Sequence, residues 1–212
     1  MLIDTFLNHI FSIDKDYKPN VIMDIGSRDL GQSLEFNSVF PESKIYAFEP
    51  NPEQVKVCDE LAIGHSNIHV EPKAISDENG TLDFYVTHGN VGASSLLEPI
   101  NVPFATSQDV TKISVDVIRL DDWMKQYNVD KVDILWLDTQ GVELKALKSM
   151  GDALKMVKFI HCEAAQQAYY KGHLLKSELE EFLISMGFDL IFNQPAYHPF
   201  GEGDIIATNK NL

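Results

Sequence analysis

Cysteine and long apolar runs are both scarce in this sequence. Its 212 residues include two cysteines, Cys58 and Cys162, which are too few for a disulfide framework or a cysteine-based zinc cluster. No apolar run approaches the ~20 residues that a helix needs to cross a bilayer. No basic residue precedes Lys15, so the N-terminus does not resemble a secretory signal. These absences predict a soluble, cytoplasmic protein.

Basic residues are scarce as well. The chain has 17 lysines and arginines against 32 aspartates and glutamates, which gives a formal net charge of -15. A surface this acidic repels phosphate backbones and anionic lipid headgroups, so neither nucleic acid nor a membrane is an expected partner. The sequence also lacks a G-x-x-x-x-G-K-[ST] loop, which excludes the usual nucleoside-triphosphate cradle.

Short β-rich apolar runs alternate with segments of helical period. Because 44% of the residues are hydrophobic, the chain can fill one core, and we predict a single domain over residues 1–212, with an N-terminal helical extension (1–20) and a core (21–209). Strands alternating with helices predict an α/β fold with a largely parallel sheet. The expected strands are Val21–Ile25, Lys44–Phe48, Ile68–Ile75, Val132–Leu137 and Phe159–Cys162, and the expected helices are Gln32–Phe40, Pro52–Ile63, Val142–Met150 and Leu174–Met186.

Two stretches depart from simple alternation. Residues 80–117 show no clear helix, only the strand-like runs TLDFYV and KISVDV around a loop. Near the C-terminus, FDLIFN and GDIIAT flank a loop rich in proline and aromatic residues. This pattern predicts an antiparallel pair at the sheet edge. We therefore expect a doubly wound sheet, with helices on both faces, that ends in an antiparallel hairpin.

Carboxylates follow every predicted parallel strand. In open parallel sheets, ligands bind outside the carboxyl ends of the strands, so these side chains are expected to share one crevice. The segments concerned are Asp24–Gly31, Glu49–Asn51, Lys73–Asp77, Asp138–Gly141 and His161–Glu163.

The first of these turns, DIGSRDLGQS, suits a nucleoside-containing ligand. Gly26 and Gly31 permit close backbone approach, and the helix that follows offers unpaired N–H donors. The second strand ends at Glu49, 25 residues after Asp24. An acidic residue at this place commonly binds the hydroxyls of an adenosine ribose. The alternative is that Glu49 caps the helix beginning at Pro52.

The charge of the first turn favours one cofactor over another. A dinucleotide site typically has G-x-G-x-x-G to hold a pyrophosphate, whereas this turn has Arg28 at the middle position and also carries Asp29. S-adenosylmethionine has no phosphate and is cationic at its sulfur and ammonium. An acidic turn in an acidic crevice suits it better.

Six pieces of the sequence form an ordered set of motifs: VIMDIGS (21–27), FPESKIYAFEPNPE (40–53), AISD (74–77), GASSL (92–96), RLDDW (119–123) and LDTQGVELKALK (137–148). In this order, and over roughly Val21–Thr208, the sequence resembles the FkbM family of S-adenosylmethionine-dependent methyltransferases. That family usually has its second glycine at the place of Leu30, and Asn is common at the place of Arg28.

The resemblance implies a Rossmann-like class I methyltransferase fold, with a mostly parallel seven-stranded sheet and a C-terminal antiparallel hairpin. It also implies that Asp24 and the turn backbone meet the amino-acid end of the cofactor, that Glu49 takes the ribose hydroxyls, and that Ala74 and Ile75 flank the adenine. The expected cofactor-binding residues are Asp24, Gly26, Ser27, Arg28, Glu49, Asn51, Ala74, Ile75, Ser95 and Asp138.

Three residues are candidates for the base that an alcohol acceptor requires: Asp138, His161 and Glu163. His161 and Glu163 share a face of one strand because side chains alternate with a period of two. The alternatives are that Asp138 caps the helix beginning near Val142 and that His161 is a structural hydrogen-bonding residue. Asp138 and Glu163 offer oxygen ligands to a divalent ion, but two carboxylates on separate strands are weak evidence, and no metal is predicted.

These residues favour an S-adenosylmethionine-dependent O-methyltransferase acting on a hydroxyl of a small metabolite or glycan, with a possible homodimer as its assembly. Two alternatives stay open. One is an NAD(P)-dependent oxidoreductase on a similar sheet, and the other is a binding module that holds S-adenosylmethionine without transferring its methyl group.

Overall fold

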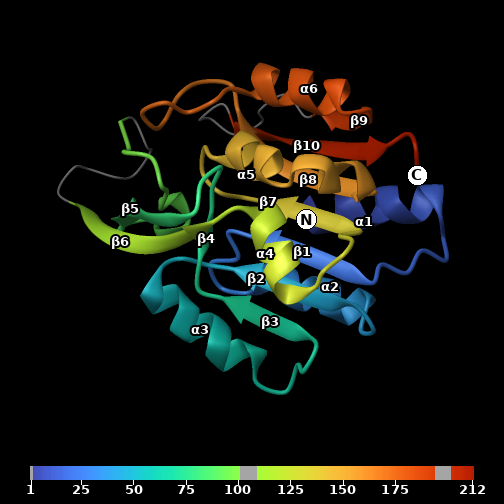
Figure 1. The fold of residues 1–212 in the computed structure, drawn as a ribbon, viewed down its shortest axis with the longest axis horizontal. Helices are drawn as coiled ribbons and strands as arrows, with labels where there is room; N and C mark the ends of the chain where they lie inside the picture. Colours follow the sequence, from blue (N-terminus) through green and yellow to red (C-terminus); the bar gives the residue numbers. More distant parts are fainter. Residues whose placement is uncertain (1, 101–108, 194–201) are drawn as a thin grey trace.

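The computed structural model describes residues 2–100, 109–193 and 202–212, in which seven strands form one sheet (Figure 1). The strand order is β3-β2-β1-β7-β8-β10-β9. The strands are β1 (Val21–Ile25), β2 (Lys44–Phe48), β3 (Ile68–Glu71), β7 (Ile134–Leu137), β8 (Phe159–Ala165), β9 (Phe188–Asn193) and β10 (Glu202–Asn209). Pairing from β3 through β8 is parallel. The predicted, mostly parallel seven-stranded sheet is confirmed.

The sheet is covered on both faces, as the near-continuous apolar strands predict. One face packs α1 (Leu2–Ile13), α2 (Gly31–Val39) and α3 (Pro52–Ala62), and the other packs α4 (Leu120–Tyr127), α5 (Glu143–Ser149) and α6 (Lys176–Ser185). Alternate residues of a strand enter different cores, since side chains point to opposite faces. In β7, Trp136 joins the core with α1 and α2, whereas Leu135 joins the core with α4–α6.

One predicted strand is wrong in its extent. The stretch Ile68–Ile75 is split by Pro72, which has no N–H to donate to a ladder. Its first part is β3, and its second part, β4 (Ala74–Ile75), pairs in a separate three-stranded sheet with β6 (Val110–Ile118) and β5 (Gly80–Thr87). This small sheet projects from one end of the main sheet (Figure 1).

The remaining predicted elements agree with the structure to within three residues, although α4 lies outside every predicted helix. The antiparallel pair at the C-terminus is confirmed, but β10 lies inside the sheet, antiparallel to both β8 and β9. The proline- and aromatic-rich loop between β9 and β10 falls on residues 194–201, outside the described residues. None of the described helices is both long and apolar enough to span a bilayer.

Candidate active site

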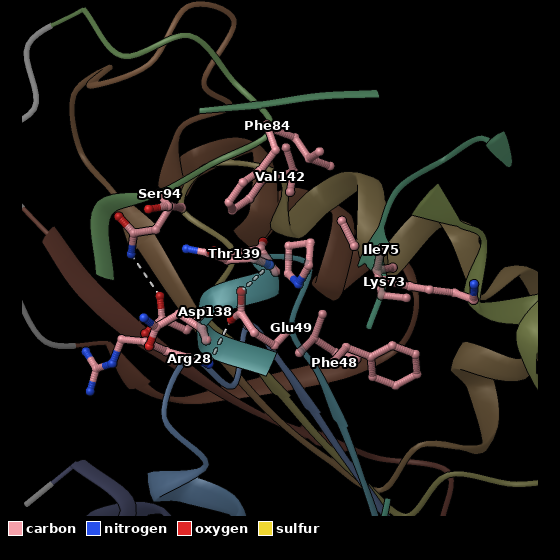
Figure 2. Close-up of a pocket in the computed structure, with 18 of the residues that line it drawn as sticks. Arg28, Phe48, Glu49, Lys73, Ile75, Phe84, Ser94, Asp138, Thr139 and Val142 are labelled. Atoms are coloured by element: carbon pink, nitrogen blue, oxygen red, sulfur yellow. Dashed lines mark hydrogen bonds between the residues drawn. The ribbon is translucent and has the colours of Figure 1, made fainter. Parts of the chain in front are cut away.

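A pocket with about 550 Å³ of atom-free space opens at the carboxyl ends of β1, β2 and β7. This is the edge at which ligands of open parallel sheets bind. Two carboxylates, Glu49 and Asp138, line it together with Ser94, as Figure 2 shows. Its apolar lining comprises Ile25, Phe48, Pro50, Ala74, Ile75, Phe84, Val91, Leu96 and Val142.

Gly26 allows the first turn to pass close to the end of β7. Its φ is 88°, and a β-carbon at this position would lie 1.9 Å from the carbonyl oxygen of Asp138. Any side chain would therefore clash with the backbone of the neighbouring strand. The N–H groups of Gly26 and Ser27 both donate to the carbonyl of Phe48, at 3.0 Å. The turn is thus held between β2 and β7.

Two further residues of this turn, both C-terminal to Gly26, also have left-handed backbone conformations. Arg28 has φ 52° and Leu30 has φ 60°, a region that glycine occupies at little cost and that other residues rarely adopt. Leu30 is fully buried in the core beneath α1 and α2. The turn therefore keeps a glycine-like backbone path at Leu30, because burial of the leucine side chain offsets the strain.

Asp24 lies beneath this turn and is not among the residues that line the pocket. Its Oδ2 accepts hydrogen bonds from the hydroxyls of Ser27 at 2.9 Å and Ser33 at 2.6 Å. Its Oδ1 is buried without a hydrogen-bond partner among the described residues, and burial raises the pKa of Asp24 to about 6. Contact of Asp24 and Ser27 with a cofactor stays a prediction.

Glu49, at the end of β2, is 6% exposed and presents its carboxylate to the pocket. Its Oε2 accepts the N–H of Arg28 at 2.9 Å, and its Oε1 accepts the N–H of Asn51 at 2.7 Å. Burial raises the pKa of Glu49 to about 7. The capping alternative for Glu49 is wrong, since the residue that caps α3 is Asn51, whose Oδ1 accepts the N–H of Glu53 at 3.1 Å.

The adenine-flanking residues predicted from the resemblance lie at the pocket. Ala74 and Ile75 form β4, and both are pocket-lining residues. Phe84, from β5 of the same small sheet, and Phe48, from the end of β2, line the pocket as well. An apolar wall therefore stands beside the Glu49 carboxylate.

Asp138 follows β7 and lines the pocket, as predicted. Its Oδ1 accepts the side-chain amide of Gln140 at 2.8 Å. The same amide nitrogen donates to Oε2 of Glu163 on β8. The structure therefore brings two of the predicted base candidates together through a glutamine that was not predicted as a site residue. The motif LDTQGVEL contained that signal.

The capping alternative for Asp138 is wrong. Val142 stands at the N-cap of α5 and makes no side-chain cap. The turn before the helix is instead closed by Glu143, whose carboxylate accepts the N–H groups of Thr139 at 2.9 Å and Gly141 at 3.0 Å. Glu143 is 3% exposed, and burial raises its pKa. The second acidic residue of the motif is therefore a loop anchor, which leaves the Asp138 carboxylate facing the pocket.

His161 is not at a strand end, because β8 continues to Ala165. Its ring is 2% exposed and stacks on Trp136, with 3.5 Å between ring centroids. Its Nε2 lies 3.1 Å from Oδ1 of Asp204 on β10. His161 is also absent from the pocket lining. The structure therefore places this base candidate in the core beneath α1, away from the proposed crevice.

The two serines of the GASSL motif do different things. Ser94 lines the pocket, whereas Ser95 is buried and donates from Oγ to the backbone carbonyl of Gln140 at 2.7 Å. Ser95, which was predicted to bind cofactor, thus ties the segment after β5 to the loop after β7. Its neighbour Ser94 has the position facing the cavity.

Among the described residues, no group of three or more His, Cys, Asp or Glu side chains is arranged to hold a metal ion. Where Asp138 and Glu163 approach each other, the amide nitrogen of Gln140 donates to both. A hydrogen-bond donor therefore occupies the place between the carboxylates at which a cation would be bound.

Comparisons with known proteins agree with the fold. Residues 24–190 match the family described as the methyltransferase FkbM domain. The chain is 31% identical over 205 residues to the 2-O-methyltransferase NoeI of Sinorhizobium fredii, covering 92% of this chain and 82% of that protein.

Solved structures share the fold at lower identity. Magnesium protoporphyrin IX methyltransferase from Synechocystis, with bound SAM, superposes with a TM-score of 0.56 at 11% identity, covering 99% of this chain and 78% of that one. TrmK from M. capricolum, in complex with S-adenosyl-homocysteine, gives a TM-score of 0.55 at 11% identity, covering 97% and 67% of the two chains.

Proposed function

Because this chain belongs to the FkbM family of methyltransferases, we propose that it methylates a hydroxyl group of a small metabolite or glycan. The fold is that of class I S-adenosylmethionine-dependent methyltransferases, and S-adenosylmethionine is the cofactor. The relative that is 31% identical is named a 2-O-methyltransferase, which supports an oxygen acceptor.

The residues around the pocket fit this cofactor. Glu49 has each carboxylate oxygen committed to one backbone N–H, which leaves further lone pairs for the two ribose hydroxyls. We assign the apolar wall of Phe48, Ile75 and Phe84 to the adenine ring. Asp24 supplies negative charge beneath the turn, where its unpartnered Oδ1 suits the ammonium of the methionine end. Acidic groups that line the pocket, Glu49 and Asp138, together with Asp24 beneath the turn, complement a cationic ligand.

When bound, S-adenosylmethionine supplies a methyl group that is already activated by its sulfonium, so the protein mainly aligns the acceptor and excludes water. An alcohol oxygen that gains the methyl group must lose its proton. We assign this proton to Asp138, because Asp138 lines the pocket and its Oδ2 accepts no hydrogen bond from a described residue. Glu163 lies behind Gln140 rather than in the pocket lining.

The observation that carries this proposal is the buried Glu49 carboxylate opening onto the same pocket as Asp138. Isothermal titration with S-adenosylhomocysteine tests the first half, and we expect Glu49→Ala to weaken binding at least about 30-fold, since hydrogen bonds to a charged group contribute about 1.5–3 kcal/mol each. Unchanged affinity in Glu49→Ala would remove the ribose assignment.

Transfer is tested by incubating the enzyme with methyl-labelled S-adenosylmethionine and a panel of methyl glycosides and polyols. We expect label in a methyl ether with the wild-type protein. Asp138→Asn keeps the size of the side chain but removes the base, so we expect it to lower kcat about 100-fold or more while binding of S-adenosylhomocysteine persists.

The two alternative functions, an NAD(P)-dependent oxidoreductase and a non-catalytic S-adenosylmethionine-binding module, predict other results in these binding and transfer experiments. An oxidoreductase would bind NAD(H) or NADP(H), yet the first turn has Arg28 where a pyrophosphate-binding turn has its middle glycine. Family membership also identifies a methyltransferase. A non-catalytic module would bind S-adenosylmethionine with the same dependence on Glu49 but would label no acceptor.

Assembly and location are further predictions. A homodimer would double the molar mass expected from 23.9 kDa for one chain, which light scattering after size-exclusion chromatography measures. Cytoplasmic location, predicted in part from the presence of only two cysteines, is tested by cell fractionation.

A further inference from the structure

The side chain of Gln140 joins four separate parts of the chain beside the pocket. Its Nε2 lies 2.8 Å from Oδ1 of Asp138 and also donates to Oε2 of Glu163. Its Oε1 lies 2.9 Å from the hydroxyl oxygen of Tyr170, and the same hydroxyl oxygen lies 2.9 Å from the carbonyl of Ala93 in the short helix η1 (Val91–Ala93). The loop after β7, strand β8, the segment after β8 and the segment after β5 therefore meet at one amide.

The chemistry of these groups fixes the orientation of that amide. An amide nitrogen carries two hydrogens and an amide oxygen carries none. The nitrogen faces two carboxylates, which accept hydrogen bonds, and the oxygen faces the Tyr170 hydroxyl, whose single hydrogen is shared with the carbonyl of Ala93. A rotated amide would place its oxygen against both carboxylates. The arrangement therefore has one favourable orientation, with one amide hydrogen for each carboxylate.

The backbone of Gln140 is held in place as strictly as its side chain. Its φ of 56° is left-handed, a conformation that costs about 1–2 kcal/mol for a residue with a β-carbon. Its carbonyl accepts the hydroxyl of the buried Ser95 at 2.7 Å. A strained residue that its surroundings hold from both sides is typical of a functional position.

We propose that Gln140 is a positioning residue for methyl transfer. Its amide, oriented by the hydroxyl of Tyr170, binds Oδ1 of Asp138 and leaves Oδ2 to take the proton of the acceptor hydroxyl. The same amide separates Asp138 from Glu163 by a neutral donor and so prevents the two carboxylates from facing each other directly. This inference rests on the proposed function, since it concerns the same reaction and the same base.

The tests begin with Gln140→Leu, which keeps most of the side-chain volume but removes both donor hydrogens. With the glycoside or polyol that the wild-type enzyme methylates fastest, we expect kcat to fall about 10- to 100-fold, corresponding to loss of a hydrogen bond to a charged group. The dissociation constant of S-adenosylhomocysteine should stay within about twofold, because its ribose and adenine contacts are assigned elsewhere. A kcat equal to that of the wild type would overturn the proposal.

Two adjacent tyrosines give a matched pair of variants. Tyr170→Phe removes the hydroxyl that contacts Gln140, whereas Tyr169→Phe removes a hydroxyl that accepts from the side chain of Gln167 at 2.8 Å instead. Both rings are buried. We expect kcat to fall about 3- to 10-fold in Tyr170→Phe and to change less than about twofold in Tyr169→Phe. Equal effects would indicate general packing and contradict the proposal.

A pH series separates positioning from a purely structural role. In Gln140→Glu, the introduced side chain regains a donor hydrogen only when it is protonated. The deficit in kcat relative to the wild type should therefore narrow as the pH is lowered from 8 to 6, with equal unfolding temperatures checked at each pH. A deficit that is constant over this range would contradict the role of a donor at this position.

The network is also testable without turnover. In ¹H–¹⁵N spectra of the full chain, the side-chain amide of Gln140, assigned by its absence in Gln140→Leu, should exchange slowly with solvent and shift in Tyr170→Phe but not in Tyr169→Phe. Fast exchange would overturn the network. If the wild-type protein methylates no member of the panel while these spectral changes occur, the choice of acceptor fails and the network stands.

Discussion

The carbonyl oxygen of Asp138 lies where a side chain at Gly26 would begin, 1.9 Å from the position of a β-carbon. The turn after β1 and the end of β7 are therefore in direct backbone contact at the floor of the pocket. This contact sets how far the Asp138 side chain stands from the first turn, and only glycine permits it.

Gly26→Ala should destabilise the protein by about 2–5 kcal/mol, as the sum of left-handed strain and overpacking. Gly64→Ala is the matched control, because Gly64 has φ 91° but a β-carbon there would meet no atom within 4 Å. We expect it to cost only about 1–2 kcal/mol. Urea unfolding of both variants measures the difference, and equal losses would show that the approach to Asp138 is not tight.

At Leu30, substitution by glycine should leave the protein more stable than substitution by alanine, the reverse of the usual order. Both substitutions remove a fully buried side chain and should destabilise the protein by about 2–5 kcal/mol. Glycine alone relieves the left-handed strain at φ 60°, so Leu30→Gly should be about 1 kcal/mol more stable than Leu30→Ala. Chemical denaturation decides, and greater stability of the alanine variant would contradict the strained geometry.

Glu143→Gln should loosen the loop that carries Asp138. The Glu143 carboxylate accepts the N–H groups of Thr139 at one oxygen and Gly141 at the other. A glutamine amide keeps only one acceptor oxygen, so its NH₂ group would direct hydrogens at one of these two donors. We expect a loss of about 1.5–3 kcal/mol in stability, measured by thermal unfolding. Glu60→Gln, on the exposed surface of α3, serves as the control and should change stability by less than about 0.5 kcal/mol.

Binding of S-adenosylhomocysteine should strengthen as the pH rises through neutrality. Ribose hydroxyls donate to the ionised carboxylate, and burial raises the pKa of Glu49 to about 7. Affinity should therefore increase up to about tenfold between pH 6 and 8, as isothermal titration measures. In Glu49→Gln this dependence should disappear, leaving a residual change near pH 6 from Asp24, whose pKa burial raises to about 6. If the affinity of Glu49→Gln for S-adenosylhomocysteine still changed with pH as that of the wild type does, with a midpoint near pH 7, the assignment of Glu49 to the ribose hydroxyls would be contradicted.

The stability of the ligand-free protein should respond to pH in the opposite direction. Burial raises the pKa of Glu49 from 4.5 to about 7, so the folded chain holds this proton more tightly than the unfolded chain. The contribution of Glu49 to stability is therefore fully present below pH 4.5 and is lost as the pH rises through 7. Glu49→Gln should gain stability relative to the wild type between pH 5 and 8. Urea titrations at each pH test this. A difference in the free energy of unfolding between Glu49→Gln and the wild type that stays constant from pH 5 to 8 would contradict the raised pKa of Glu49.

The sequence alone predicted the parallel sheet and the two carboxylates that line its pocket. Apolar runs such as those of β1 and β7 are long enough to specify strands, and alternation with helices leaves few ways to connect them. Glu49 and Asp138 could be placed because each directly follows such a strand, and the carboxyl ends of parallel strands meet at one edge.

Only the tertiary structure decided the exact residue at which each strand ends and the direction in which individual side chains point. The end of β8 lies three residues beyond the predicted end, which moves His161 from the rim into the core. Neighbours such as Ser94 and Ser95 point in different directions, so their roles depend on a backbone phase that sequence does not specify. The contacts of Gln140 with Glu163 and Tyr170 join residues 23 and 30 positions apart. The sequence therefore determined which strand ends meet, whereas packing of distant segments decided which atoms face the pocket.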